Sequence, residues 1–297
     1  MQWSGVIPAL TTNFRANGAL DRRALAKHCG WLIEHRVSGL VCCGSLGEAP
    51  TLAFDEKVAV AETCVKAAAG RVPVALGVAA LSTREAVALA RAGARAGCAG
   101  LMVLPPYVYS TDWREMRAHV SAVIAATRLS CMLYNNPPAY KTDFMPEQVA
   151  ELAAQHANLR AIKESSGDVR RITALRALLG ERLALLVGLD DAIVEGVRAG
   201  ATGWIAGLVN AFPAESVALF EAARSGDRAQ ADALYAWFLP LLRLDAAPKF
   251  VQLIKWLQAQ EGRGAETVRA PRLALAGEEL AQVRRIYDEA RTSRPAL

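Results

Sequence analysis

Short apolar runs alternate with longer amphipathic segments along the first three quarters of the chain. Eight such runs occur, at 5–10, 39–43, 72–76, 100–104, 131–134, 159–163, 183–187 and 202–206. Continuous apolar strands are typical of a parallel sheet that is covered on both faces. A repeat of about 30 residues predicts successive strand–helix–strand units. Eight units over about 225 residues fit an α/β fold of the (β/α)8, or TIM barrel, type.

The segments between these runs carry helix start signals. Ser82 and Glu85 have the spacing of a capping box and predict a helix over 83–96. Asp112 and Asp168 stand at the same place before two further helical patterns. A doubly wound open sheet is the alternative fold. The barrel is favoured because no G-x-G-x-x-G turn follows the first strand.

The alternation of strands and helices stops after the eighth unit. Three helical patterns and no strand pattern follow, near 227–242, 248–260 and 277–291. We therefore expect a barrel over residues 1–226 and a C-terminal helical extension over 227–297 that packs on it. No low-complexity linker separates the two parts, so no independent second domain is required.

Composition and charge indicate a cytoplasmic protein rather than a membrane or nucleic-acid-binding protein. No apolar run reaches the ~20 residues that span a bilayer, and no secretory signal is visible at the N-terminus. The net charge of +5 is spread over scattered basic residues, many of them close to acidic ones. Such a pattern is typical of a solvated surface.

The six cysteines and four histidines do not predict a metal site. No C-x-x-C pair occurs, and no cluster has the spacing of zinc ligands. The cysteines mostly lie in apolar stretches, so we expect buried, reduced thiols. All four histidines fall in helical patterns, which argues against a Ser-His pair.

The active site of a barrel of this kind lies at the C-terminal ends of the strands. Polar strings follow four of the predicted strands, at 44–48, 134–137, 163–166 and 188–191. Lys163 stands out because burial at the barrel mouth favours a neutral amine, which attacks carbonyls and imines. A surface lysine paired with Glu164 is the alternative interpretation.

Two further strings add candidate chemistry. Tyr134 ends the neighbouring strand and can shuttle protons, unless it is a core aromatic with a locally satisfied hydroxyl. Gly44 and Gly47 flank Ser45 and Leu46 in a turn that can direct backbone N–H groups at a carboxylate. A plain strand–helix turn is the alternative there.

Together these strings resemble the dihydrodipicolinate synthase/N-acetylneuraminate lyase family, from residue 5 through residue 205. The family pattern G-[ST]-x-G-E matches 44–48, Y-N-x-P matches 134–137, and I-K-[ED] matches 162–164. Three motifs in the family order, each at the end of an expected strand, make the resemblance specific.

The resemblance implies a homotetramer of barrels that needs no metal or organic cofactor and acts on a small 2-oxo or imino acid. It implies that Lys163 forms the Schiff base, that Tyr134 moves protons, and that the substrate carboxylate rests on the turn. We therefore expect catalysis by Lys163, Tyr134 and Ser45, and substrate contacts from Gly44, Ser45, Leu46, Asn136 and Ile205.

Three positions depart from the dihydrodipicolinate synthases. Leu46 replaces a second hydroxyl residue, and Ala139 replaces the arginine that holds the carboxylate of the aldehyde substrate. Val108 replaces a tyrosine that reaches a neighbouring subunit's site. These losses argue against lysine biosynthesis and for a substrate without that second carboxylate.

The strings at 44–48, 134–137, 163–171 and 203–213 are similar to one branch of the family, the 1-pyrroline-4-hydroxy-2-carboxylate deaminases. Lys141 departs from that branch, where glycine is expected. The similarity implies that Lys163 opens a cyclic imine, that water leaves from C4 with Tyr134 or Ser45 as acid, and that 2,5-dioxopentanoate and ammonia are released.

Four other functions stay open at this point. Three are enzymes that share the Schiff-base step: a 2-keto-3-deoxy sugar acid aldolase or dehydratase, a hydroxy-oxo-acid aldolase, and dihydrodipicolinate synthase itself. The fourth is an inactive ligand-binding regulator, against which the presence of both Lys163 and Tyr134 argues.

Overall fold

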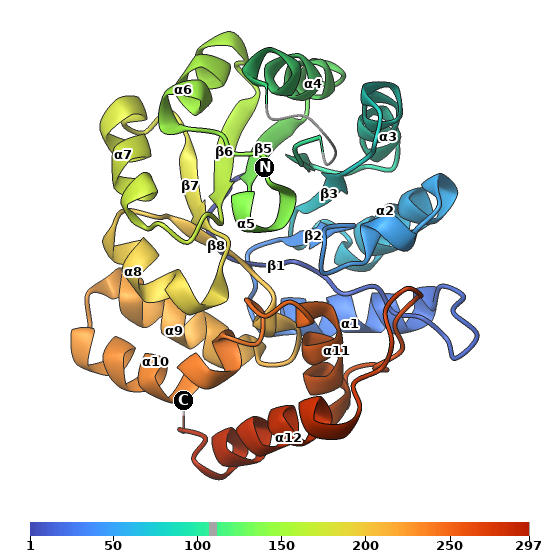
Figure 1. Cartoon of the computed structure of the whole chain (residues 1–297), viewed down its shortest axis with the longest axis vertical. Coiled ribbons are helices and arrows are strands. Elements are labelled where there is room, and N and C mark those ends of the chain that lie inside the picture. Colours follow the sequence, from blue (N-terminus) through green and yellow to red (C-terminus); the bar gives the residue numbers. More distant parts are fainter. Residues whose placement is uncertain (107–111, 297) are drawn as a thin grey trace.

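The computed structural model describes residues 1–106 and 112–296, and it confirms the (β/α)8 barrel. Eight parallel strands lie at the centre with helices around them (Figure 1). They are β1 (Gly5–Pro8), β2 (Leu40–Cys42), β3 (Val74–Val78), β4 (Gly100–Val103), β5 (Ser130–Asn135), β6 (Leu159–Glu164), β7 (Ala184–Val187) and β8 (Gly203–Ala206). The backbone N–H of Leu10 donates to the carbonyl of Val41 at 2.8 Å, which joins β1 to β2 and nearly closes the barrel.

One longer helix follows each strand. In order they are α1 (Arg22–Glu34), α2 (Phe54–Ala68), α3 (Thr83–Arg95), α4 (Trp113–Ala125), α6 (Pro146–Gln155), α7 (Arg170–Leu179), α8 (Ile193–Arg198) and α9 (Pro213–Ser225). Four short helical turns lie at strand ends: η1 (Ala49–Thr51), α5 (Pro137–Tyr140), η2 (Asp190–Ala192) and η3 (Leu208–Asn210).

The expected helix start signals are present in the structure. The Ser82 side chain accepts the backbone N–H of Glu85 at 3.2 Å, and Asp112 accepts that of Glu115 at 3.1 Å. These bonds satisfy N–H groups that the first turn of a helix leaves free. Helix α7 begins at Arg170, one residue later than the sequence predicts, and Asp168 accepts the Arg170 N–H at 3.1 Å.

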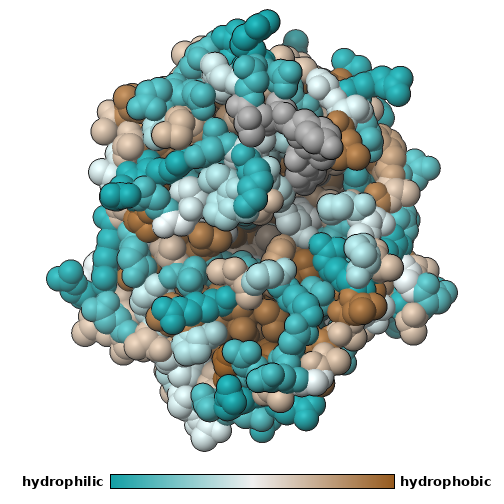
Figure 2. Space-filling view, in the orientation of Figure 1, coloured by the Kyte–Doolittle hydropathy of each residue, from teal (hydrophilic) through white to brown (hydrophobic). Residues whose placement is uncertain are grey.

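The three predicted C-terminal helices are α10 (Arg228–Leu242), α11 (Phe250–Gln260) and α12 (Gly277–Thr292). They lie together beside α1, α8 and α9, at the orange-to-red end of the colour scale in Figure 1. Helix α11 is almost entirely buried, and the Trp237 indole of α10 donates to the carbonyl of Ala290 in α12 at 3.0 Å. Hydrophobic residues still show beside these helices on the surface in Figure 2.

The strands supply the centre of one continuous hydrophobic core. Almost every strand residue is buried, which explains why the runs read as uniformly apolar. All six cysteines are free thiols and are buried, as expected. Across the described residues, no helix combines the length and the apolar character that a membrane crossing requires.

Candidate active site

A cavity of about 550 Å³ lies at the C-terminal ends of the strands. The residues predicted for the site all line it, namely Gly44, Ser45, Leu46, Tyr134, Asn136, Lys163 and Ile205. A second hollow, of about 760 Å³, lies at the opposite end of the barrel, around Ser130 and Ala184 at the starts of β5 and β7. Catalytic groups of (β/α)8 barrels lie at the C-terminal end, so the smaller cavity is the candidate active site.

Lys163 lies inside the cavity and not on the surface. Its residue is 6% exposed, and its Nζ lies 4.1 Å from the centre of the Tyr134 ring. The two residues are register partners on the adjacent strands β5 and β6, so the sheet itself places them side by side. The Glu164 carboxylate points elsewhere and accepts the Ser166 N–H at 2.6 Å and the Asn135 amide at 3.1 Å. The alternative of a surface Lys163–Glu164 pair is therefore wrong.

Gly188, directly after β7, makes room for the Lys163 side chain. A Cβ atom at this position would lie 2.5 Å from Lys163 Cε and 2.0 Å from Ser165 Oγ. Real carbon contacts are not that short, so any larger residue at 188 would displace the lysine.

The Tyr134 hydroxyl is oriented by its neighbour Asn136. The Asn136 side chain donates to the Tyr134 hydroxyl at 2.9 Å, and its carbonyl oxygen accepts the Ala139 N–H at 3.2 Å. Because the hydroxyl accepts from Asn136, its own proton remains available to a substrate. Tyr140, which sequence analysis missed, packs edge-on against Tyr134 and hydrogen-bonds with the Ser45 hydroxyl.

We expect Tyr134→Phe to lower kcat by roughly 10²–10⁴-fold, because the variant keeps the ring beside Lys163 but loses the proton donor. The covalent adduct with pyruvate should still form. Steady-state kinetics and borohydride trapping measure the two effects. Tyr235→Phe is the matched control, since Tyr235 bonds to the backbone of Asp191 and does not line the cavity. A Tyr134→Phe enzyme with unchanged kcat would exclude the proton-transfer role.

The turn at 44–48 is held tightly against the end of β1. A Cβ atom on Gly47 would lie 2.9 Å from the Leu10 carbonyl oxygen, so glycine is required there. Within the two described ranges, the backbone N–H groups of Ser45 and Leu46 have no acceptor. Both residues line the cavity, so these groups are free to bind an anion.

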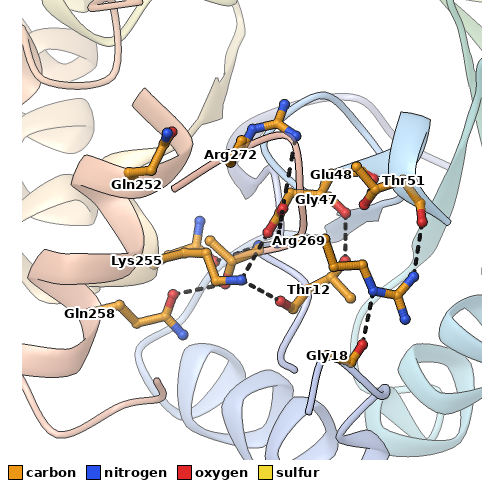
Figure 3. Close-up of polar contacts among 12 residues, drawn as sticks. Thr12, Gly18, Gly47, Glu48, Thr51, Gln252, Lys255, Gln258, Arg269 and Arg272 are labelled. Atoms are coloured by element: carbon orange, nitrogen blue, oxygen red, sulfur yellow. Dashed lines mark hydrogen bonds and ion pairs between the residues drawn. The ribbon is translucent and has the colours of Figure 1, made fainter. Parts of the chain in front are cut away.

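Glu48, the last residue of this turn, ties it to the C-terminal extension (Figure 3). Its carboxylate is fully buried and accepts Lys255 Nζ of α11 at 2.9 Å and the Arg269 N–H at 3.0 Å. Lys255 also donates to the backbone carbonyl of Thr12, and the Thr12 hydroxyl donates to the backbone carbonyl of Gly47. Burial lowers the pKa of Lys255, against the opposing charge of Glu48. The family glutamate therefore supports the site without facing the cavity.

The C-terminal extension also contributes to the cavity wall, which sequence analysis did not foresee. Asp245, from the segment joining α10 to α11, and Phe250, the first residue of α11, line the cavity together with Arg272. Ala139 lines it too, without an arginine at that position. Arg272 lines the same cavity, and its guanidinium group lies 3.8 Å from the Glu48 carboxylate. No sequence pattern marked these residues, because they lie far along the chain from the strand ends.

The sequence departs from its relatives at Lys141 and at Val108, and the structure bears on only the first of these positions. Lys141 ends α5 with a φ of 63°, in the left-handed region that favours glycine, which explains why a glycine is expected there. Val108 lies outside the described residues, so the expectation for it stays open. In the described part of the chain, no three histidine, cysteine, aspartate or glutamate side chains are arranged to hold a metal ion.

A parallel barrel with a buried lysine beside a tyrosine at its mouth defines the class of barrel lyases that work through a lysine Schiff base. The sequence matches the dihydrodipicolinate synthetase family over residues 2–290. The chain belongs to this family.

Curated relatives and solved structures agree with this assignment. A 4-hydroxy-tetrahydrodipicolinate synthase of Sorangium cellulosum is 38% identical and covers 93% of this chain and 91% of its own. One from Agrobacterium fabrum is 34% identical, with 91% and 92% covered. A family protein from Escherichia coli K12, solved in complex with pyruvate, superposes with a TM-score of 0.92 at 28% identity, over 98% of this chain and 99% of that one.

Proposed function

We propose that this protein converts 1-pyrroline-4-hydroxy-2-carboxylate to 2,5-dioxopentanoate and ammonia through a Schiff base on Lys163. The observation that carries the proposal is the placement of Lys163, buried against Tyr134 in a cavity that also presents the free N–H groups of Ser45 and Leu46. A carboxylate on those N–H groups would bring the neighbouring C2 atom of a small 2-oxo or imino acid to the amine.

The reaction would proceed in four steps. The neutral Lys163 amine adds to C2, and the ring nitrogen leaves as a primary amine. The resulting iminium draws electrons, so a C3 proton is lost and an enamine forms. The enamine expels the C4 hydroxyl as water, with Tyr134 as the acid. Finally, one proton from C5 and one from the terminal nitrogen shift to C3 and C4, so that C5 becomes an imine. Two water molecules hydrolyse this imine and the Lys163 iminium to give ammonia, 2,5-dioxopentanoate and free Lys163. Because one water molecule left at C4, the net reaction consumes one.

Ser45 has a supporting place in this scheme. Its hydroxyl bonds with that of Tyr140, at the rim of the cavity beside Tyr134. This pair can hold the C4 hydroxyl or pass a proton to it, while Ile205 of β8 supplies an apolar wall. The uncharged side chains of Ser45, Tyr140 and Ile205 in this part of the cavity suit a substrate with one carboxylate.

Dihydrodipicolinate synthesis is the second candidate, and two observations favour it. The curated relatives above carry that name, and Arg272, which lines the cavity and pairs with Glu48 at 3.8 Å, is a cation within reach of a second carboxylate. Against it stand Leu46 and Ala139, which offer neither a hydroxyl nor a guanidinium where those enzymes have them.

The two candidates are separated by one pair of assays. The purified protein is given the pyrroline and ammonia is measured; in parallel it is given pyruvate with the aldehyde substrate of dihydrodipicolinate synthases. We expect ammonia release that depends on Lys163, and no condensation. No ammonia above the Lys163→Ala background would eliminate the deaminase, and rapid condensation would establish the synthase. Release of pyruvate from a sugar-derived oxo acid would indicate an aldolase instead.

A homotetramer, as the resemblance implies, is part of the same proposal. One solved relative is described as a monomeric variant, so members of the fold differ in assembly. Light scattering on the purified chain measures its state directly.

A further inference from the structure

Asp245 is a carboxyl group in the cavity to which the scheme above gives no task. It lies in the segment between α10 and α11, and it lines the same cavity as Lys163, Tyr134 and Ser45. Carboxyl groups are costly to place in a confined cavity unless they bind a partner, so a function for this side chain is expected.

The backbone at the end of β8 is shaped to admit this side chain. A Cβ atom on Gly207 would lie 1.9 Å from Asp245 Oδ1 and 2.4 Å from its Cγ. The carboxyl group therefore rests directly on the backbone of residue 207, and every residue except glycine would push it away.

Asp190, which bonds to the same stretch of backbone, provides a contrast. Its carboxylate accepts the Trp204 indole at 2.8 Å, the Gly207 N–H at 3.1 Å and the Leu208 N–H at 2.7 Å, and thus fixes the loop after β8. Asp245 accepts no hydrogen bond from any residue in the described ranges. The buried Asp190 carboxylate is occupied by the fold, and the half-buried Asp245 carboxylate is left for a ligand.

The surroundings of Asp245 favour the protonated form of its carboxyl group, as a general acid requires. Burial, followed by the negative charge of Asp190, raises the pKa of Asp245 well above its usual value, and the positive charge of Lys163 acts in the opposite direction. A carboxyl group in this position holds a proton at a pH at which an exposed aspartate has lost it.

We propose that Asp245 is the acid–base group that protonates the departing ring nitrogen when Lys163 attacks a cyclic imine. This inference rests on the proposed function, and it extends that function by explaining why an imine, and not only a 2-oxo acid, is opened. A 2-oxo acid loses an oxygen in the corresponding step, and Tyr134 is placed to protonate it.

The protons and electrons of this step balance without a further reactant. As Lys163 Nζ bonds to C2, the π pair of the C=N bond moves to the ring nitrogen, which takes the proton of the Asp245 carboxyl group. The attached lysine nitrogen, now cationic, gives one proton back to the carboxylate. Asp245 passes this proton to the ring nitrogen, which leaves C2 with the bonding pair. The products are a primary amine, the Lys163 iminium and the Asp245 carboxylate.

The test uses two probes that both present a C2 carbon beside a carboxylate but differ in the atom that must leave, which is the carbonyl oxygen in one and the ring nitrogen in the other. Pyruvate and 1-pyrroline-2-carboxylate are each mixed with the full-length protein, borohydride is added after increasing times, and the adduct is quantified by intact mass. We expect Asp245→Asn to form the pyruvate adduct at close to the wild-type rate and the pyrroline adduct at least about 100-fold more slowly. Asp191→Asn is the matched control, because Asp191 neighbours Asp190 but does not line the cavity.

Two further variants guard against misfolding as the explanation. Gly207→Ala, which displaces the Asp245 carboxyl group while retaining it in the chain, should show the same selective loss. Asp245→Ala should regain pyrroline adduct formation when acetate is added.

The inference would be overturned if Asp245→Asn changed the rates of both adducts by the same factor relative to wild type. It would also be overturned if the wild-type protein formed the pyruvate adduct but not the pyrroline adduct. If the wild-type protein forms both adducts but releases no ammonia from the hydroxylated pyrroline, the proposed substrate fails and the role of Asp245 stands.

Discussion

Replacing Lys163 by alanine is expected to abolish the covalent adduct with pyruvate and to lower kcat/KM by on the order of 10⁴-fold or more. The amine that forms the Schiff base is lost, and no other described lysine lines the cavity. The variant should still fold, because the side chain makes no ion pair with any residue that the structure describes and the cavity already contains space for solvent. Circular dichroism and the thermal midpoint check this point.

Lys249→Ala is the control for that experiment. Lys249 lies between two cavity-lining residues, Pro248 and Phe250, but its amine is half exposed and pairs with Glu279 at 2.5 Å. This variant should keep both the adduct and the activity. An adduct of normal yield in Lys163→Ala would show that another group carries the chemistry.

Glu48→Gln is expected to lower the free energy of unfolding by about 3–5 kcal/mol, because it leaves the buried Lys255 ammonium without its counter-charge. Lys255 and Glu48 are 1% and 0% exposed, so water cannot replace the lost partner. For a chain of this size the change corresponds to a decrease of roughly 10 °C in Tm, measured by scanning calorimetry. The turn that carries Ser45 and Leu46 should loosen as well, which raises KM.

Glu279→Gln provides the comparison for Glu48→Gln. It breaks an ion pair with Lys249 in which both side chains are 50% exposed, and solvent screening limits the loss to about 1 kcal/mol or less. Similar Tm values for the two variants would mean that the buried pair does not anchor the turn. A Glu48→Gln, Lys255→Met double variant should recover part of the lost stability, since neither charge is then left alone.

The fold could be predicted from the sequence because parallel strands covered on both faces read as uniformly apolar runs. Each run at the observed spacing became one strand of the barrel, and side-chain caps such as Ser82 set the helix starts. The pairing of Lys163 with Tyr134 follows from the same logic, since sequential strands are neighbours in a barrel and their ends meet at one mouth.

The remaining parts of the site depend on contacts between distant segments, which local patterns do not encode. Asp245 reaches the cavity because the extension folds back over the barrel, and the glycine that admits it is Gly207, directly after β8. The partner of Glu48 is Lys255, 207 residues further along the chain. Tyr140 reaches Ser45 only because α5 turns the chain after Asn136.

The C-terminal extension therefore completes the active site in addition to packing on the barrel. It supplies Asp245 and Arg272 to the cavity, and it holds the turn at 44–48 through the bonds of Lys255 and Arg269 to Glu48. The C-terminal extension is therefore expected to affect both the stability of the fold and the choice of substrate. Substitutions in it should change substrate choice more readily than substitutions in the strands, which form the common scaffold.

The central claim is that one amine, at the end of the sixth strand, condenses with the substrate. The chain has seven lysines, so the site of condensation can be mapped without ambiguity. The wild-type protein is reduced with borohydride in the presence of pyruvate, digested, and sequenced by mass spectrometry. The account predicts a single modified lysine, Lys163. Modification of a different lysine, or none at saturating pyruvate, would contradict it.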